Sequence, residues 1–236
     1  MNGLLVRVGA DQSEGGGHWN GPIDPPTGEF VYVPIPEPGQ CRPGLATPYR
    51  KVGSHLGGQW PALPSHLARR NAHLDPDFAH LTYGDRGQRS KQIATKLARG
   101  DLLAFYAGLR DIHPGQPLVY ALIGLLVIDR IVPVERVLPA AFHENAHTRR
   151  AEPFSTNDIV VHGQREVSGR LAKAIPIGHY HQNAYRVLPS LLTAWGGLGV
   201  SGGYLQRSAR LPAFIDATVF YRWLTAHRIP LLQRNN

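Results

Sequence analysis

The stretch that decides the fold runs from Leu102 to Ile128 and reads LLAFYAGLRDIHPGQPLVYALIGLLVI. Two apolar runs, Leu102–Ala107 and Leu118–Ile128, enclose a connection in which Gly115 lies between two prolines. Apolar runs of this length, bounded by Gly and Pro, are typical of buried strands joined by a turn. We therefore predict two core strands that form a hairpin. The second run has about half the ~20 residues that a membrane-spanning helix requires, so no membrane span is expected.

Further elements are expected on both sides of this hairpin. Short β-branched or apolar runs predict strands, and apolar residues three or four positions apart predict helices. The predicted strands cover residues 4–8, 29–36 and 158–161, and the predicted helices cover residues 90–97, 139–147, 185–195 and 213–227. Residues 38–65 are rich in Pro and Gly without periodicity, which predicts a long irregular connection. We expect a single α+β domain over residues 1–236, with a helical C-terminal part over residues 185–236.

The charge is positive and unevenly distributed. The chain has 25 Lys+Arg against 17 Asp+Glu, a formal net charge of +8. Residues 41–100 carry +7 and residues 166–236 carry +6, whereas residues 1–40 carry −4 and residues 101–165 carry −1. Of the 25 cations, 21 are Arg, whose planar guanidinium matches phosphate and guanine edges. This balance favours a nucleic-acid partner.

Composition also excludes several classes of protein. Apolar residues make up 42% of the chain and charged residues 18%, which excludes wholesale disorder. The single cysteine, Cys41, excludes an internal disulfide and a multi-cysteine zinc site. The N-terminal residues lack the basic and apolar segments of a signal peptide. We therefore expect a cytoplasmic protein.

One segment matches a metalloprotease motif. His143-Glu144-Asn145-Ala146-His147 has the form H-E-x-x-H, which on a helix places two imidazoles on one face, where they bind zinc while the Glu activates water. The context is weak, because Pro139 lies one turn upstream and a polar Asn occupies a position that is usually apolar. A zinc site built on His143 and His147 remains an alternative.

Two polar clusters are the stronger candidates. Asp75, Asp77 and Asp85 lie within eleven residues inside the basic block 41–100, where carboxylates could bind Mg²⁺ or act as a base, although Asp also caps turns. The segment 145–150 combines an amide, an imidazole and two guanidinium groups, a set that suits reading a base edge while holding phosphate.

These segments together resemble a known family. The chain is similar to the nucleotide-modification-associated domain 3 family, which is found beside phage and bacterial systems that make or handle modified DNA bases. The stretches that carry the resemblance are Leu5–Gly9 with Asp11, Asn20–Pro22, Phe30–Glu37, His73–Phe78, Leu81–Asp85, Gly100–Leu109, Ile123-Gly124, and Asn145–His147 with Arg149-Arg150. The resemblance implies a modified nucleic acid as context more firmly than it implies a reaction. His143 and Glu144 lie outside the matching pattern.

A second resemblance concerns the fold. Residues 100–106 and the strand containing Ile123-Gly124 look like the corresponding strands of the PUA and EVE domains, small barrels that hold a modified base at the barrel mouth. It implies an α+β fold with a mixed, partly closed β-barrel core like that of PUA and EVE domains, surrounded by helices.

The leading hypothesis is a nucleic-acid-associated protein that recognises or processes a modified DNA base or nucleotide. The base would be extruded from a duplex to reach such a pocket. In this hypothesis Trp19 and Tyr83 stack on the base, Asn20, Asn145 and His147 bind its edge, Arg149 and Arg150 hold phosphate, and the candidates for catalysis are Asp75, Asp77, Asp85 and His147. The alternatives are the zinc-dependent hydrolase and a non-catalytic partner of a base-modifying enzyme. The expected partners are DNA or a modified nucleotide, and the cofactor and oligomeric state are left open.

Overall fold

The predicted hairpin forms the centre of the molecule. The computed structural model describes residues 1–11, 19–151, 154–181, 184–205 and 210–236. Strands β7 (Leu102–Asp111) and β8 (Leu118–Pro133) pair antiparallel along their length, from Leu102 opposite Val127 to Arg110 opposite Leu118. Both strands extend beyond the apolar runs that predicted them.

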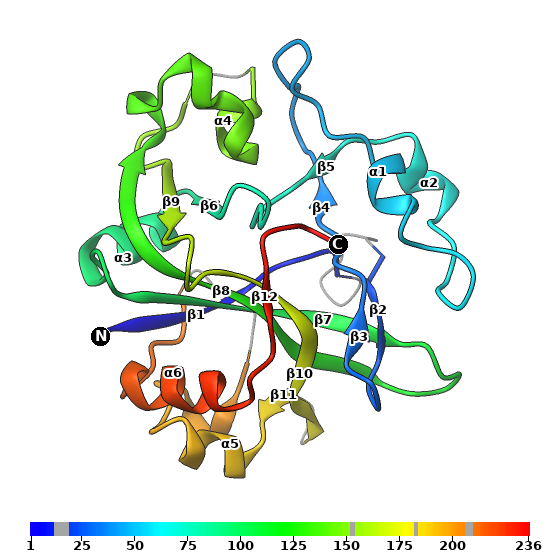
Figure 1. Ribbon diagram of the computed structural model, residues 1–236, viewed down its shortest axis with the longest axis vertical. Helices are drawn as coiled ribbons and strands as arrows, with labels where there is room; N and C mark the ends of the chain where they lie inside the picture. Colours follow the sequence, from blue (N-terminus) through cyan, green and yellow to red (C-terminus); the bar gives the residue numbers. More distant parts are fainter. Residues whose placement is uncertain (12–18, 152–153, 182–183, 206–209) are drawn as a thin grey trace.

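A large mixed sheet is built around this hairpin (Figure 1). Its main path has the order β11-β10-β8-β7-β2-β3, with β1 also paired to β7 and β12 to β10. The pairs of β1 and β2 with β7 are parallel, and the other pairs in the sheet are antiparallel. The other strands of the path are β2 (Pro22–Asp24), β3 (Glu29–Phe30), β10 (Gly169–His181) and β11 (Ala184–Val187), and the two strands beside it are β1 (Gly3–Arg7) and β12 (Leu231–Leu232).

The length of β8 makes the sheet curl. Its C-terminal part continues beyond Leu102, the first residue of β7, and pairs with β9 (Ile159–Gly163), which in turn pairs with β6 (Thr82–Asp85). The sheet therefore bends into a half-barrel, visible in Figure 1. The expected α+β fold with a partly open barrel is confirmed, whereas the closer likeness to PUA and EVE domains remains a prediction.

Both faces of the sheet are buried, which explains the unbroken apolar runs in the sequence. Successive side chains of a strand point to opposite faces. Leu103 and Phe105 of β7 accordingly belong to one apolar cluster, and Leu102 and Ala104 to another. The first cluster also takes in Ile93 of α3 (Gln88–Lys96).

The helices of the C-terminal part cover the second face. Helices α5 (Pro189–Ala194) and α6 (Ala217–Ala226) pack there, with Trp195 and Phe220 fully buried between them and the sheet. A third apolar cluster lies under the irregular connection over residues 38–65, which contains the short helix α1 (Arg50–Gly53) and is followed by α2 (Ser65–Ala68). None of the helices in the described residues has the length and apolar character needed to cross a bilayer.

Three local expectations need correction. The strand predicted over residues 29–36 is split into β3 and β4 (Ile35–Pro36), and β4 pairs instead with β5 (Ala72–His73). The C-terminal part is not wholly helical: the helix predicted from residue 185 begins at Pro189, and residues 184–187 form β11. Proline favours the first turn of a helix, which fits this start.

The third correction concerns the H-E-x-x-H segment. The helix predicted over residues 139–147 is a 3₁₀ helix, Pro139–Glu144, followed by α4 (Ala146–Arg149). Asn145 between them is extended, with φ −145° and ψ 150°, and its side chain accepts a hydrogen bond from the backbone N–H of His147. Asn is a strong N-cap residue, so it starts a new helix here and does not continue the old one. His143 and His147 therefore do not share the face of one helix.

Candidate functional site

A polar cavity of about 220 Å³ lies beside the first apolar cluster. Its walls come from the end of β1, from β5 and β6, from the start of α3, and from α4. Its lining residues are Arg7, Val8, Gly9, Asp11, Ile35, Pro38, His73, Asp75, Tyr83, Gly84, Asp85, Arg86, Arg89, His147 and Arg150. Segments far apart in the chain thus meet at one site.

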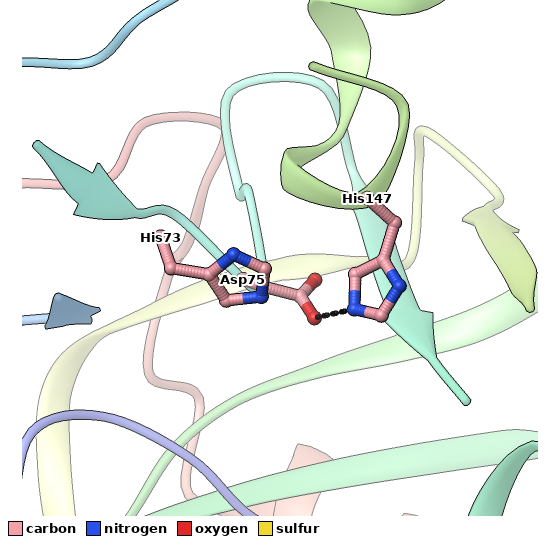
Figure 2. Close-up of side chains that lie close together, drawn as sticks. All are labelled: His73, Asp75 and His147. Carbon is pink, nitrogen blue, oxygen red and sulfur yellow. Dashed lines mark ion pairs between the residues drawn. The ribbon is translucent and has the colours of Figure 1, made fainter. Parts of the chain in front are cut away.

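His147 is fixed in this wall by a buried carboxylate. Its Nδ1 atom lies 2.5 Å from Oδ1 of Asp158, the residue just before β9, and both side chains are 6% exposed. A carboxylate only accepts hydrogen bonds, so Nδ1 carries a proton, and Nε2 is the nitrogen that can accept a proton or bind a ligand. That Nε2 atom is 3.7 Å from Oδ2 of Asp75 (Figure 2).

Asp75 is held from one side only. Its Oδ1 atom accepts hydrogen bonds from the backbone N–H of Gly84, at 2.8 Å, and from Nδ2 of Asn145, at 3.1 Å. Burial raises the pKa of Asp75 to about 7, although His147 and these two hydrogen bonds act in the opposite direction. Oδ2 is left facing His147.

His73 has the same kind of support as His147. Its Nδ1 atom lies 2.7 Å from Oε2 of Glu37, and Nε of Arg150 donates to the other oxygen of that carboxylate at 3.0 Å. Burial lowers the pKa of His73, and Arg150 and His147 add to this, whereas Glu37 opposes it. Burial acts to raise the pKa of Glu37, but His73 and Arg150 outweigh it and the pKa is lowered. The β4–β5 pair, in which Ile35 lies opposite His73, brings this histidine next to Glu37.

His73, Asp75 and His147 form the chemical centre of the cavity (Figure 2). Their nitrogen and oxygen ligand atoms all lie within 4.8 Å of one another, and the two imidazole rings have centroids 5.3 Å apart. Such a set can exchange protons with a bound molecule or bind a metal ion.

Guanidinium groups surround this centre. Arg7 pairs with Asp11, Arg150 with Glu37, and Nε of Arg89 lies 2.9 Å from Asp85. Arg86, in the short connection between β6 and α3, is exposed and makes no ion pair with a carboxylate among the described residues. Arginine-lined cavities favour anions such as phosphate.

The structure brings together five of the predicted site residues. These are Asp75, Tyr83, Asp85, His147 and Arg150, all of which line the cavity. Asn145 lies behind the wall, where it positions Asp75 and caps α4. Tyr83 is 3% exposed and its hydroxyl lies between Asp85 and Arg89, at 2.5 and 2.6 Å, so the phenol is not an open stacking surface. Burial and Asp85 raise the pKa of Tyr83, against the effect of Arg89.

The remaining predicted residues lie outside the described lining of the cavity. Asp77 and Arg149 form a buried pair at 2.5 Å, which has a structural role. Trp19 is buried in the third apolar cluster and does not present a free ring for stacking. Asn20 is fully buried, with its Nδ2 atom 2.7 Å from the carbonyl oxygen of Gly108. His143 does not line the cavity, and its ring packs against His80.

Sequence reasoning missed several site residues. His73 and Glu37 lie in stretches that were recognised, His73–Phe78 and Phe30–Glu37, but neither received a role. The spacing His73-x-Asp75 was a signal for a paired imidazole and carboxylate. Asp158 stands alone in the sequence, and only the pairing of β9 with β6 and β8 brings it to His147.

Fold and site together define an α+β half-barrel protein with a polar, arginine-lined cavity over a buried histidine–carboxylate cluster. The chain belongs to the nucleotide modification associated domain 3 family, whose model matches residues 2–210. The name of the family associates it with nucleotide modification. No curated protein and no solved structure matches the chain.

Proposed function

We propose that this protein recognises or processes a modified DNA base or nucleotide in the cavity between β5, β6 and α4. One observation carries the proposal: the segments 75–85 and 145–150 meet there, and both contribute polar side chains to one wall. A protein that only positioned another enzyme would not need such a cavity. The membership of the family supports the same class of ligand.

The size of the cavity favours a single base over a whole dinucleotide. Its volume of about 220 Å³ is below the about 300–1,000 Å³ of cavities that enclose drug-sized ligands. The base would lie against the buried imidazoles and carboxylates, which offer donors and acceptors for its edge. Its sugar and phosphate would remain at the rim, where Arg86 is exposed.

In duplex DNA, a target base would have to leave the stack. Unstacking costs a few kcal/mol and is easiest for a modified, mismatched or single-stranded base. The basic blocks around the cavity would hold the backbone while this happens. The interior of the cell, where DNA and nucleotides occur, is the expected place of action.

The zinc-hydrolase alternative on His143 and His147 has weaker support. The interruption at Asn145 separates the two histidines, and His147 alone reaches the cavity. Substituting each of the two histidines separately therefore distinguishes the nucleotide pocket from the zinc hydrolase.

The test is incubation of the protein with a panel of modified and unmodified nucleosides, nucleotides and short DNAs, followed by mass spectrometry for bound or converted species. The panel is run with added divalent metal and again with chelator. We expect binding or turnover of at least one modified species, loss of it in His147→Gln, and retention in His143→Gln. If none of the nucleosides, nucleotides and DNAs bound at low salt, the proposal would be wrong.

A further inference from the structure

We infer that His73, Asp75 and His147 form a binding site for one divalent transition-metal ion, open toward the cavity. The inference deepens the proposed function and rests on it only for the role of the ion, because ion binding itself requires no nucleotide. It uses a different set of residues from the H-E-x-x-H motif. Only His147 is common to both.

Both imidazoles are arranged as metal ligands. Nδ1 of His147 is held by Asp158 at 2.5 Å and Nδ1 of His73 by Glu37 at 2.7 Å. Metal-binding histidines commonly donate one ring N–H to a carboxylate, which fixes the tautomer and leaves the other nitrogen to bind the ion. Nε2 of His73 has no hydrogen-bond partner among the described residues, and Nε2 of His147 faces Asp75.

Asp75 supplies an oxygen ligand in the same space. Gly84 and Asn145 both donate to its Oδ1 atom, so the carboxylate is oriented while Oδ2 stays open. Its side chain is 6% exposed and lies in the wall of the cavity. An oriented carboxylate with one open oxygen is suited to binding a metal ion.

The ion pairs around Asp75 also favour a bound cation beside it. Three other buried carboxylates nearby pair with a guanidinium group: Glu37 with Arg150, Asp77 with Arg149, and Asp85 with Arg89. Among the described residues, the salt-bridge partner of Asp75 is His147, at 3.7 Å. A buried carboxylate without a full cationic partner is unfavourable, and a bound dication would compensate it.

The ligand set selects the class of ion. Two imidazole nitrogens and one carboxylate oxygen suit zinc, iron(II), cobalt or manganese, whereas Mg²⁺ and Ca²⁺ prefer oxygen ligands throughout. Three protein ligands leave coordination positions free for water or a nucleotide oxygen.

The spacing of the ligands is compatible with such an ion. Even at the widest separation of 4.8 Å, an ion placed between the three atoms would lie within about 2.8 Å of each. Shifts of less than about 1 Å would bring the contacts to the about 2.0–2.2 Å of metal bonds to nitrogen and oxygen.

The experiment is metal titration of the full chain after removal of metal with a chelator. Cobalt(II) is followed by its visible absorption, and zinc and Mg²⁺ by calorimetry. We expect one equivalent of cobalt or zinc with nitrogen–oxygen coordination, competition between the two, and much weaker binding of Mg²⁺. Absence of stoichiometric cobalt and zinc binding by the folded protein would overturn the inference.

Variants locate the ion. His73→Gln and Asp75→Asn should weaken cobalt binding by more than the about 10–100-fold caused by loss of an outer partner. His143→Gln, outside the cavity, should bind as the wild type does. Circular dichroism shows whether each variant is folded. Asp75→Asn keeps the shape of the side chain and an oxygen that can accept the hydrogen bonds from Gly84 and Asn145. Loss of binding in His143→Gln with retention in folded Asp75→Asn would also overturn the inference.

The same samples separate this inference from the proposed function. Nucleotide binding that persists in chelator, without any metal binding, would contradict the metal site and leave the nucleotide pocket supported. Metal binding without any nucleotide binding would support the metal site and contradict the proposed nucleotide pocket.

Discussion

Nδ1 of His147 lies 2.5 Å from Oδ1 of Asp158, and this pair fixes the imidazole in the wall of the cavity. His147 belongs to α4 and Asp158 precedes β9, so the contact also ties the helix to the curled end of the sheet. Because the carboxylate accepts a hydrogen bond from Nδ1–H, the nitrogen of the ring that can bind a ligand is Nε2.

The first prediction tests this orientation. In Asp158→Asn the amide can donate to Nδ1 as well as accept from it, so the ring is no longer confined to one tautomer. We expect cobalt and zinc affinity to fall about 10–100-fold while the fold is retained. Calorimetry measures the affinity, and circular dichroism checks the fold. An unchanged affinity would show that Asp158 does not orient the ligand.

The second prediction concerns the close approach of β6 to α4. A Cβ atom at Gly84 would lie 2.4 Å from Cδ2 of His147 and 2.7 Å from Oδ1 of Asn145. Gly84→Ala should therefore displace the N-terminus of α4, at a cost of about 1–3 kcal/mol in the free energy of unfolding, and abolish metal and nucleotide binding.

Gly44→Ala is the matched control. An added Cβ there meets no atom within 4 Å, although φ is +78°, so only backbone strain of about 1–2 kcal/mol is expected. Urea denaturation measures stability, and the ligand titrations measure the site. If Gly84→Ala binds ligands as well as Gly44→Ala does, the contact with α4 does not shape the cavity.

The sequence predicted the hairpin because its signals are local: two apolar runs around a Gly/Pro turn. Strand β11 was missed because Val187, Leu188 and Leu191 also satisfy helical spacing. Tyr185 stacks on Tyr120 of β8 with ring centroids 4.1 Å apart, a contact that no local pattern contains. Tertiary packing therefore decides the structure of this segment.

Part of the site, like part of the fold, could be predicted from local patterns in the sequence. Asp75 and His147 were found because each lies in a dense polar segment, and both line the cavity. Glu37 and Asp158 are isolated carboxylates, whose roles depend on the β4–β5 pair and on β9. Trp19 illustrates the opposite error, because an aromatic residue beside a polar segment can equally be part of a core.

The third prediction concerns Asp77 and Arg149, which were expected to act on the ligand. Their buried contact at 2.5 Å, with His80 and Asn235 also bound to Asp77, indicates a structural role. Arg149→Met should lower the free energy of unfolding by about 3–5 kcal/mol, because it leaves a buried carboxylate without its guanidinium partner.

The control for this pair is Arg99→Met. Arg99 is 78% exposed and lies 3.3 Å from Asp129, so its removal should change the free energy of unfolding by less than about 1 kcal/mol. Urea denaturation measures both variants. Equal effects would contradict the structural assignment of Arg149.

The fourth prediction is a pH dependence at His162, on β9. Burial lowers the pKa of His162, the Arg130 guanidinium adds to this, and Glu144 and Asp129 oppose it. Below the ordinary histidine pKa of about 6.5, His162 binds a proton in the unfolded chain but stays unprotonated in the folded protein. The free energy of unfolding therefore decreases as the pH falls. His162→Gln removes the effect. The stability of the wild type relative to this variant should therefore be lower at pH 5 than at pH 7.5, and a difference independent of pH would refute the assignment.

The last prediction concerns Arg86 at the rim of the cavity. Since it is exposed and has no carboxylate partner among the described residues, Arg86→Ala should leave stability unchanged. If the arginine holds a phosphate, nucleotide affinity falls by about 1 kcal/mol, or about fivefold, and the salt dependence of DNA binding becomes shallower by about one unit of slope. Arg222→Ala, on α6 across the sheet, removes the same charge away from the cavity. Equal losses in both variants would mean that the net charge, and not Arg86, holds the phosphate.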